Sequence, residues 1–341
     1  MPQRPVRAWL SLVVAWTVVS GIGAVNAGRA GGIARKLRPC DCRYPMPMNR
    51  CLSDLCTLLD LETLEVNLFR GQSRDLGGRS VYGGQVISQA LVAATRTVDE
   101  QPPHSLHAYF LRPGDMEAPI VYEVDRVRDG RSFTTRRVQA IQHGQPILSL
   151  IASFQRPETG FEHQLPMPPV PTPEQLGDQR QQRLAWLAAE LARNPALPER
   201  IQYLFTREQA FEFAWIDPPN PFDPDVRAPQ QGIWFRAAGQ LPDDPLLHRC
   251  VLAYASDFNL AATALLPHAR SWFSPDMIVA SIDHALWFHR DVRVDDWLFY
   301  SMDTPTAQSV RGLSRGLIYD RDGRLVASAA QECLMRQIKP A

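Results

Sequence analysis

The sequence predicts an α+β protein built from two repeated units, in which each unit wraps an antiparallel sheet around a helix. Three observations lead to this prediction. Segments of the first half reappear in the second half in the same order, each unit opens with an apolar helical stretch, and short extended segments with turn residues follow it. Because short connections imply antiparallel pairing, we expect a pseudo-dimer within one chain of 341 residues.

The repeat appears in three pairs of segments. VYGGQVISQALVAA aligns with AYASDFNLAATALL, which places Tyr82 on Tyr254. HSLHAYFLRPGD aligns with SIDHALWFHRDV, which places His107 on His284, and QHGQPILSLIASF aligns with DRDGRLVASAAQE. The separation along the chain is nearly constant, so we interpret each half as one copy of a duplicated structural unit.

Each unit is expected to contain one helix and then a series of strands. In the first unit the helix covers 81–94, and PIVYEVDRV, RSFTTRRVQAIQ and PILSLIASFQ are rich in β-branched and aromatic residues. In the second unit a helix is expected over 253–266, followed by DWLFYSMD, QSVRGLSRGLIY and RLVASAAQECLM. The turn sequences RDG, HGQP and DRDG separate these strands. Gly83 and Gly84 favour a close approach of strands to the first helix.

Changes in composition divide the chain into four expected regions. Residues 1–47 form an N-terminal extension, 48–156 the first unit, 157–231 a Pro-rich linker and 232–341 the second unit. Within the linker, RPETGFEHQLPMPPVPTPEQ lacks periodicity, whereas QQRLAWLAAELARN predicts a short amphipathic helix.

The N-terminal extension admits three interpretations. A basic MPQRPVR precedes an uncharged apolar stretch over 8–28, which suits either a signal peptide ending near VNA or one membrane span. In the third interpretation the extension is absent from the working protein, and Met48 is the natural start. The cytoplasm is the expected compartment, while export or a membrane anchor through 8–28 stays open.

Composition argues against several classes of partner and cofactor. The formal net charge is zero, so no overall field attracts nucleic acid, and we expect no nucleic-acid partner. Four of the six cysteines lie in the N-terminal sixth of the chain, and none has the spacing of a typical zinc site. We interpret the cysteines as reduced thiols and expect no metal and no other cofactor. The sequence matches G-x-S-x-G once, as GLSRG over 312–316, but this match lies inside the expected strand QSVRGLSRGLIY and not at a strand-to-helix turn, so it does not predict a nucleophile elbow. A complete phosphate-binding loop is absent from the sequence.

An acidic residue in an apolar segment is the first candidate for chemistry. AYASDFNLAATALL predicts a buried helix, and Asp257 and Asn259 stand near its start. A carboxylate there can cap the helix by accepting hydrogen bonds from free backbone N–H groups. The alternative is a catalytic group at the mouth of a pocket.

Six motifs together resemble the acyl-CoA thioesterase II family: LFRGQS, VYGGQVISQAL, HSLHAYFLRPGD, AYASDFNL, SIDHALWFHR and ASAAQECLMR. The resemblance covers about residues 55–337. It implies a double hotdog fold, in which two helix-in-sheet units are fused, and hydrolysis of fatty acyl-CoA to a free fatty acid and CoA. It also implies an Asp–Ser/Thr–Gln catalytic set, which falls on Asp257, Ser281 and Gln331.

The repeat supports this assignment, because the two units differ at all three positions. Each candidate also has a structural explanation: a helix cap for Asp257, a plain strand hydroxyl for Ser281 and a solvated edge strand for Gln331. The alignment pairs Asp257 with Gln85, Ser281 with His104, and Gln331 with Ser153.

Five further residues are candidates for lining or supporting the pocket. His284 recurs in the alignment as His107, so we interpret both as structural, and His104 is a weaker candidate for the pocket wall. Four arginines suit either CoA phosphates or a solvent-exposed face: Arg126, Arg128, Arg136 and Arg137. The candidates are Gly84, Gln85, His104, Asn259 and His284.

Two other functions remain open at this point. The chain could be a non-catalytic acyl-CoA-binding protein that keeps the duplicated fold with an idle site. It could also be a hotdog enoyl-CoA hydratase, although that chemistry needs an Asp and a His close together on the helix, and no His follows Asp257 in that stretch. We also expect a homo-oligomer, either a dimer or a tetramer.

Overall fold

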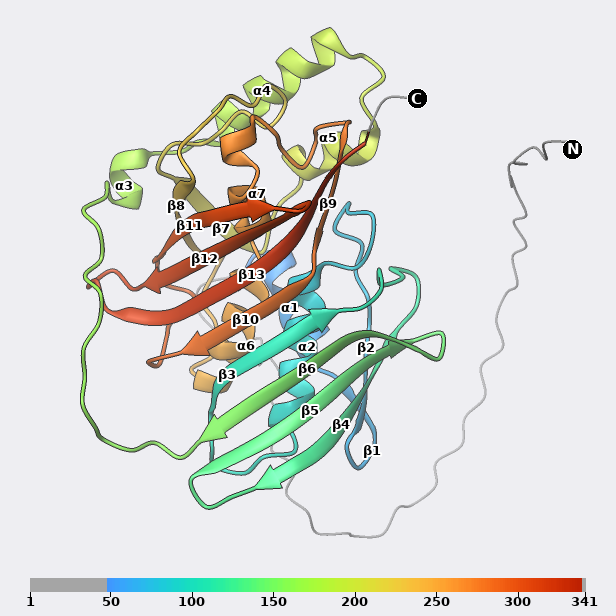
Figure 1. Cartoon of the computed structure of the whole chain (residues 1–341), viewed down its shortest axis with the longest axis vertical. Coiled ribbons are helices and arrows are strands. Elements are labelled where there is room, and N and C mark those ends of the chain that lie inside the picture. Colours follow the sequence, from blue (N-terminus) through green and yellow to red (C-terminus); the bar gives the residue numbers. More distant parts are fainter. Residues whose placement is uncertain (1–47, 339–341) are drawn as a thin grey trace, which may run out of the picture. The chain divides into compact units, whose positions relative to one another are not determined.

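Thirteen strands pair into one antiparallel sheet in the computed structural model, which describes residues 48–338 (Figure 1). The strand order is β1-β2-β4-β5-β6-β3-β10-β13-β12-β11-β8-β7, and β9 also pairs with β13. The predicted α+β architecture, a double hotdog, is confirmed. The strands are β1 Glu62–Glu65, β2 Leu68–Gly71, β3 Pro103–Phe110, β4 Ile120–Asp129, β5 Phe133–Gln142, β6 Gln145–Gln155, β7 Phe211–Trp215, β8 Gln230–Ala237, β9 Met277–Ser281, β10 Asp283–Phe288, β11 Leu298–Gln308, β12 Arg311–Tyr319 and β13 Leu325–Gln337.

The two halves of the sheet join where β3 pairs with β10. This pairing is antiparallel, and Leu106 of β3 lies opposite Leu286 of β10. Strands β9 and β10 follow one another along β13, with a break between them at Ile282. The N–H of Ile282 donates to the carbonyl of Glu332, and its own carbonyl accepts from Phe110. Ser281, the last residue of β9, therefore stands at the seam between the halves.

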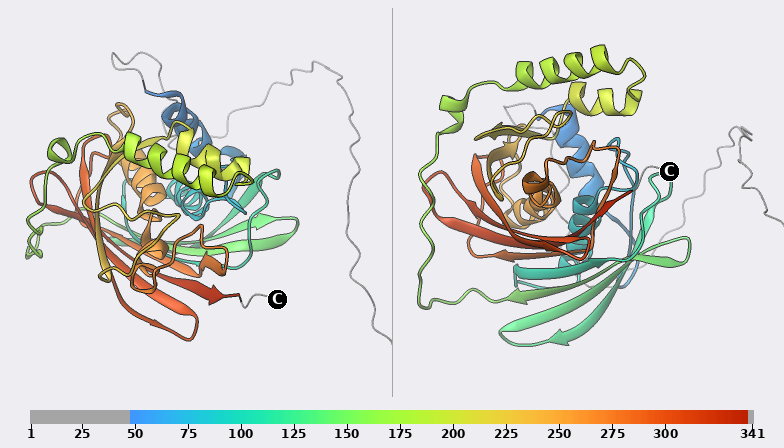
Figure 2. Two further views of the ribbon diagram at one scale, coloured as in Figure 1. Left: turned by 90° about the horizontal axis from the view of Figure 1, so that it is seen from above. Right: turned by 45° about the horizontal axis from the view of Figure 1, so that its top comes forward.

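Helices α2, Gly83–Thr95, and α6, Pro245–Ser256, pack against each other on one side of the sheet (Figure 2). Every residue of α2 after Gly83 is buried. Most of its side chains are small or apolar, and the buried Gln85 and Gln89 form internal hydrogen bonds, for example with the Gln72 carbonyl. Helix α6 begins with Pro245 after Asp244, whose carboxylate caps the backbone N–H groups of Leu246 and Leu247.

The prediction of one continuous helix over 253–266 is wrong. Helix α6 ends at Ser256, and Asp257 is its C-terminal cap residue rather than an N-cap. Asn259 has a positive φ of 65°, a left-handed conformation that interrupts the helix. A short helix α7, Leu260–Thr263, and a 3₁₀ turn, Leu266–His268, follow. The apolar sequence continues across this break, and for that reason composition does not reveal it.

One helical stretch in the described part of the chain, Pro245–His268, is long and apolar enough by composition to cross a membrane. It is 72% buried within the fold, as expected of the core helix in a double hotdog. The predictions for residues 8–28 fall outside the described residues.

The region predicted as a linker carries more structure than one helix. Helix α4, Arg180–Arg193, lies where the sequence predicts a helix, and α3 Pro173–Leu176 and α5 Glu199–Thr206 flank it. Strand β7 pairs with β8 and extends the sheet of the second half. Gln179 ties the start of α4 to this strand, because its amide both donates to and accepts from the backbone of Trp215, at 2.8 and 2.9 Å. Helix α1, Arg50–Leu59, precedes the first strand.

Candidate active site

Asp257 lies where the C-terminus of α6 meets the N-terminus of α2. Its Oδ2 accepts a hydrogen bond of 2.9 Å from the backbone N–H of Gly84. Its Oδ1 is buried and has no hydrogen-bond partner among the described residues. Burial raises the pKa of Asp257 to about 7, and the hydrogen bond from the Gly84 N–H and the nearby Gln331 amide oppose this increase. A carboxyl group with this pKa can accept a proton near neutral pH.

Two glycines at the start of α2 permit this contact. A Cβ atom on Gly84 would lie 2.3 Å from the carbonyl oxygen of Tyr254, and one on Gly83 would lie 2.7 Å from Asp257 Oδ2. The glycines therefore allow α6 to approach α2, and Gly83 also admits the Phe110 side chain of β3, to which a Cβ atom would lie 2.8 Å away, in line with the predicted approach of strands. Tyr82, which precedes them, donates its hydroxyl to the same Tyr254 carbonyl.

A second set of polar groups extends inward from Ser281. The amide nitrogen of Gln331 donates to Ser281 Oγ at 2.6 Å, and the amide oxygen lies 2.8 Å from His284 Nδ1. His284 Nε2 lies 2.9 Å from the Oγ of Ser256, the last residue of α6. Tyr300 donates to the Ser256 carbonyl at 2.8 Å. Gln331 and His284 are each only 1% exposed, so these bonds form in the interior.

The tautomer of His284 follows from its neighbours. Asp257 lies on the Ser281 side of Gln331 and favours the amide NH₂ group there, so the amide oxygen faces His284. An oxygen only accepts, so Nδ1 carries the hydrogen and Nε2 of the neutral ring can only accept. The Ser256 hydroxyl lies 2.9 Å from both His284 Nε2 and the Ala253 carbonyl oxygen, so these two acceptors compete for its hydrogen. Burial lowers the pKa of His284 to about 4, which keeps the ring neutral. His284 thus fixes which end of the Gln331 amide faces Ser281.

Asp257 and Ser281 both open onto a cavity of about 1350 Å³, which we call the main cleft. Its wall includes Gly83 at the N-terminus of α2. No hydrogen bond joins the Gly83 N–H to another residue within 48–338. Gln331 and His284 do not line the cleft and support it from behind. Arg79, Arg112 and Arg200 also line the cleft; they are exposed, and none forms an ion pair within the described residues.

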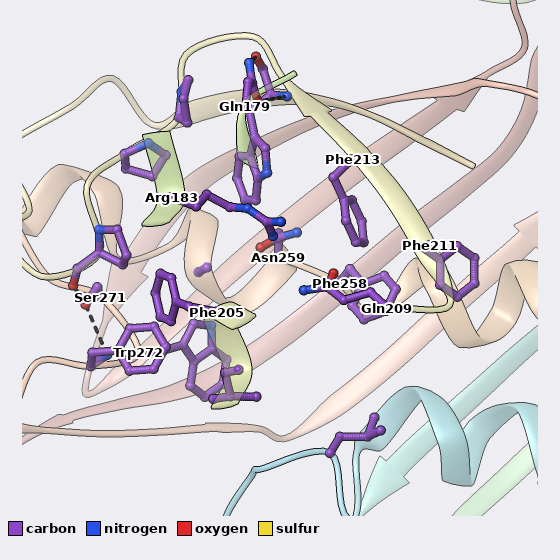
Figure 3. Close-up of a pocket in the computed structure, with 18 of the residues that line it drawn as sticks. Gln179, Arg183, Phe205, Gln209, Phe211, Phe213, Phe258, Asn259, Ser271 and Trp272 are labelled. Atoms are coloured by element: carbon purple, nitrogen blue, oxygen red, sulfur yellow. Dashed lines mark hydrogen bonds between the residues drawn. The ribbon is translucent and has the colours of Figure 1, made fainter. Parts of the chain in front are cut away.

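A second cavity of about 370 Å³, the aromatic cavity, adjoins the main cleft (Figure 3). Phe258 and Asn259, the two residues after Asp257, line both cavities. Most of the remaining wall is apolar and comes from α4, α5, β7 and the chain after α7. Its aromatic side chains include Trp186, Phe205, Phe211, Phe213, Trp272 and Phe273. A largely apolar cavity therefore begins at Phe258, the residue after Asp257.

The structure places three of the five candidate support residues at the site and two away from it. Gly84 binds Asp257 through its backbone, Asn259 lines both cavities, and His284 binds Gln331. Gln85 lines neither cavity; its side chain donates to the carbonyl of Gln72 at 3.2 Å inside the first half. His104 also lies away from the cleft, bonded to Ser153 Oγ at 2.8 Å.

The repeat alignment is wrong in detail. Gln85 lies in the first turn of α2, whereas Asp257 follows the last turn of α6, so the two are not equivalent. His107 is exposed and His284 is buried, although equivalent strand positions must face the same side of a sheet. The pairing of Ser281 with His104 therefore fails as well. The alignment matched short Tyr-small-small sequences that lie at opposite ends of the two helices.

Sequence reasoning missed two features of the site and considered one set of phosphate-binding residues that lies elsewhere. Ser256 was overlooked because a Ser in an apolar helix carries no distinctive signal. The contact between Gly84 and Asp257 joins residues from different halves. None of the four arginines considered for CoA phosphates, Arg126, Arg128, Arg136 and Arg137, lines either cavity. Arg136 is buried, and Arg137 pairs with Asp125.

Within residues 48–338, no cluster of three or more His, Cys, Asp or Glu side chains is arranged to hold a metal ion. Cys51, Cys250 and Cys333 are free thiols. Burial raises the pKa of Cys333 to about 11, so this thiol stays protonated and is a poor nucleophile.

Comparison with known proteins gives matches over both halves. The family model described as acyl-CoA thioesterase matches residues 203–334, and the model described as acyl-CoA thioesterase N-terminal domain matches 72–155. Acyl-CoA thioesterase 2 of Haemophilus influenzae is 42% identical over 290 residues, which cover 85% of this chain and 99% of that protein. Human acyl-coenzyme A thioesterase 8 is 40% identical, covering 83% and 89% of the two chains.

Solved structures agree with these matches. The acyl-CoA thioesterase II TesB2 of Mycobacterium marinum is 40% identical, with a TM-score of 0.66, and the match covers 83% of this chain and 98% of that one. A protein from Alicyclobacillus acidocaldarius described as having a hot dog fold has a TM-score of 0.63 at 20% identity, over 84% and 99% of the chains, and supports the fold alone.

Proposed function

For a chain that belongs to the acyl-CoA thioesterase family and hydrolyses acyl-CoA thioesters, we propose that Asp257, Ser281 and Gln331 position and activate the attacking water. The observation that supports this most is the unpartnered Oδ1 of Asp257 beside the cleft that Ser281 also lines. A buried acceptor without a partner favours a water molecule as its hydrogen-bond donor.

In the proposed reaction a water molecule donates one hydrogen bond to Asp257 Oδ1 and contacts Ser281 Oγ. The Gln331 amide holds Ser281 in place through their 2.6 Å hydrogen bond. Asp257 takes a proton as the water oxygen attacks the thioester carbonyl carbon. The C–S bond then breaks, and the proton passes to the departing sulfur to give CoA thiol and a free carboxylic acid.

The N-terminus of α2 is the proposed site of charge stabilisation. Attack places negative charge on the carbonyl oxygen, and backbone N–H groups at a helix N-terminus stabilise such a charge. Gly83 supplies a backbone N–H at the cleft wall, and the Gly84 N–H is already bound to Asp257. We assign the oxyanion contact to Gly83.

The two cavities suggest how fatty acyl-CoA lies in the site. The acyl chain fits the aromatic cavity, whose apolar wall begins at Phe258 next to Asp257. The phosphates of CoA fit the outer part of the main cleft, near Arg79, Arg112 and Arg200, because guanidinium groups bind phosphate oxygens well. This arrangement places the thioester between them, at the junction of the cavities.

The alternatives are less well supported. A hydratase needs a His beside the Asp, but no His lines either cavity among the described residues, and His284 is buried behind Gln331. A non-catalytic binder would have no need for a carboxyl group whose pKa is raised to about 7 at the cleft.

Release of CoA thiol from decanoyl-CoA, measured with a thiol reagent, tests the assignment. Ser281→Ala and Gln331→Ala should each reduce kcat/KM about 100-fold, since each removes one group that orients the water. Activity should survive EDTA, because the proposed mechanism uses no metal. Equal activity in the wild type and both variants would remove Ser281 and Gln331 from the mechanism.

A homo-oligomer and a cytoplasmic location remain part of the proposal. The outer face of the sheet carries exposed apolar side chains, Tyr109 at 59% and Ile151 at 44%, on the adjacent strands β3 and β6. Such a face supports association of copies as a dimer or tetramer. Free thiols at Cys51, Cys250 and Cys333 suit a reducing compartment.

A further inference from the structure

The carboxylate of Asp257 has few direct contacts that fix its direction. Within residues 48–338 the backbone N–H of Gly84 donates to its Oδ2, and the Gln331 amide lies nearby. No ion pair involves the carboxylate in this part of the chain. Its direction must therefore come from the backbone segment that carries it, residues 256–259.

Tyr300 holds this segment on the N-terminal side of Asp257. Its hydroxyl group, on β11, donates to the carbonyl of Ser256 at 2.8 Å. Ser256 is the last residue of α6, and carbonyl groups at the end of a helix have no donor within the helix. Tyr300 is 2% exposed and Ser256 is fully buried, so this hydrogen bond takes the place that water has at an exposed helix end.

Gln231 holds the segment on the C-terminal side of Asp257. Its amide nitrogen, on β8, donates to the carbonyl of Asn259 at 3.2 Å and lies 2.5 Å from Thr263 Oγ1. The Thr263 hydroxyl donates to the same Asn259 carbonyl at 2.8 Å. Asn259 is left-handed, with a φ of 65°, and a residue other than glycine keeps this conformation only where its surroundings hold it. The two donors therefore stabilise a turn that is unfavourable by itself.

The two holding side chains stand on neighbouring strands. Strand β8 pairs with β11, and Gln231 lies opposite Met302, two residues after Tyr300. The sheet therefore sets the spacing between the two donors. Between the bonded carbonyls, the ring of Phe258 is enclosed by four aromatic rings at centroid distances of 5.2 to 5.8 Å (Figure 3). These rings belong to Tyr82, Phe211, Phe213 and Tyr254.

We propose that Tyr300 and Gln231 are positioning residues for thioester hydrolysis, which hold the backbone on either side of Asp257 and so direct its Oδ1 toward the attacking water. This inference rests on the proposed function, in which Asp257 accepts a proton from that water. Tyr300 lines neither cavity and Gln231 lines only the aromatic cavity, so both act through Asp257 and not on the thioester. A misplacement of about 1 Å can cost on the order of 100-fold in rate.

The experiment removes each donor and compares the effects on kcat and KM for decanoyl-CoA. Tyr300→Phe and Gln231→Leu should each lower kcat about 10- to 100-fold and change KM less than about threefold. Tyr122→Phe and Gln164→Leu are the matched controls. Tyr122 is a buried tyrosine whose hydroxyl donates to a side chain at 2.7 Å, and the Gln164 amide bonds two backbone groups. Neither control residue lines a cavity, so both controls should keep the wild-type kcat even where denaturant unfolding shows an equal loss of stability.

The same substitutions in an Asp257→Asn background show whether the effect passes through the carboxylate. There each should lower the residual kcat, measured with excess enzyme, less than about twofold. The inference is overturned if the loss is as large in this background as in the wild type, or if both single variants keep the wild-type kcat. If Tyr300→Phe does not fold, Gln231→Leu completes the same comparison from the other strand. Failure of the proposed function is distinguishable, because then Asp257→Asn by itself stays active.

Discussion

Replacing Asp257 by Asn should separate catalysis from stability. The Asn oxygen can still accept the Gly84 N–H, so the contact between the helices is kept. The amide nitrogen then faces the cleft, where the wild-type protein has a proton acceptor. Loss of a general base typically costs on the order of 100- to 10,000-fold in rate, and we expect a decrease of kcat/KM in this range.

The same change should stabilise the protein at alkaline pH. The pKa of Asp257 rises from 3.8 to about 7 on folding, so the folded state holds a proton that the unfolded state releases above about pH 4. Stability of the wild type therefore falls as the pH rises from about 4 to 7 and stays lower above that. At about 1.36 kcal/mol for each pKa unit, the full difference corresponds to about 4 kcal/mol. Part of Asp257 reaches the cleft, so this value is an upper bound.

Thiol release and denaturant unfolding at pH 4.5 and pH 8 would measure both effects. Asp257→Asn should gain stability over the wild type at pH 8 and little at pH 4.5. The control is Asp244→Asn, at the opposite end of α6. Asn caps a helix about as well as Asp, and residue 244 lines neither cavity. The reasoning is refuted if Asp257→Asn stays active, or loses activity only in step with lost stability at pH 8.

Three further outcomes follow from the site. Because Asp257 must be ionised to accept a proton, kcat/KM should rise about tenfold per pH unit below about 7 and level off above it; a flat profile from pH 5 to 8 would exclude this role. His284→Asn should keep a donor toward Gln331 and most activity, whereas His284→Leu should lose about 100-fold in kcat; equal losses would mean that His284 only fills space. Gly84→Ala should destabilise the fold by about 1–3 kcal/mol, because its Cβ would meet the Tyr254 carbonyl at 2.3 Å. Gly160→Ala has open space and should be neutral in the same unfolding measurement.

The duplicated architecture could be predicted from the sequence, because hydrophobic patterns and turn residues repeat in order. The site could be predicted in part. Ser281 and Gln331 are 50 positions apart in the sequence, and the structure brings the Gln331 amide nitrogen to 2.6 Å from Ser281 Oγ. Motif resemblance identified them, and the strand alternation that buries Gln331 is a local property of β13. Their exact roles stay a prediction.

The rest depended on tertiary contacts. The mostly apolar composition continues on both sides of Asp257, so composition does not mark the end of α6, and the left-handed Asn259 interrupts the helical stretch. The partner of Asp257 is a backbone N–H from the other half, which no side-chain pattern encodes.

Because the two halves are joined in one chain, the geometry of the site should not depend on protein concentration. Asp257 comes from one half and Gly84 from the other, and the pairing of β3 with β10 carries the sheet from half to half. In a site assembled from separate subunits, activity per molecule vanishes below the dissociation constant. Here the linker holds the two halves at a high effective concentration whatever the amount of protein present. Each chain should therefore keep its catalytic geometry at concentrations where any oligomer has come apart.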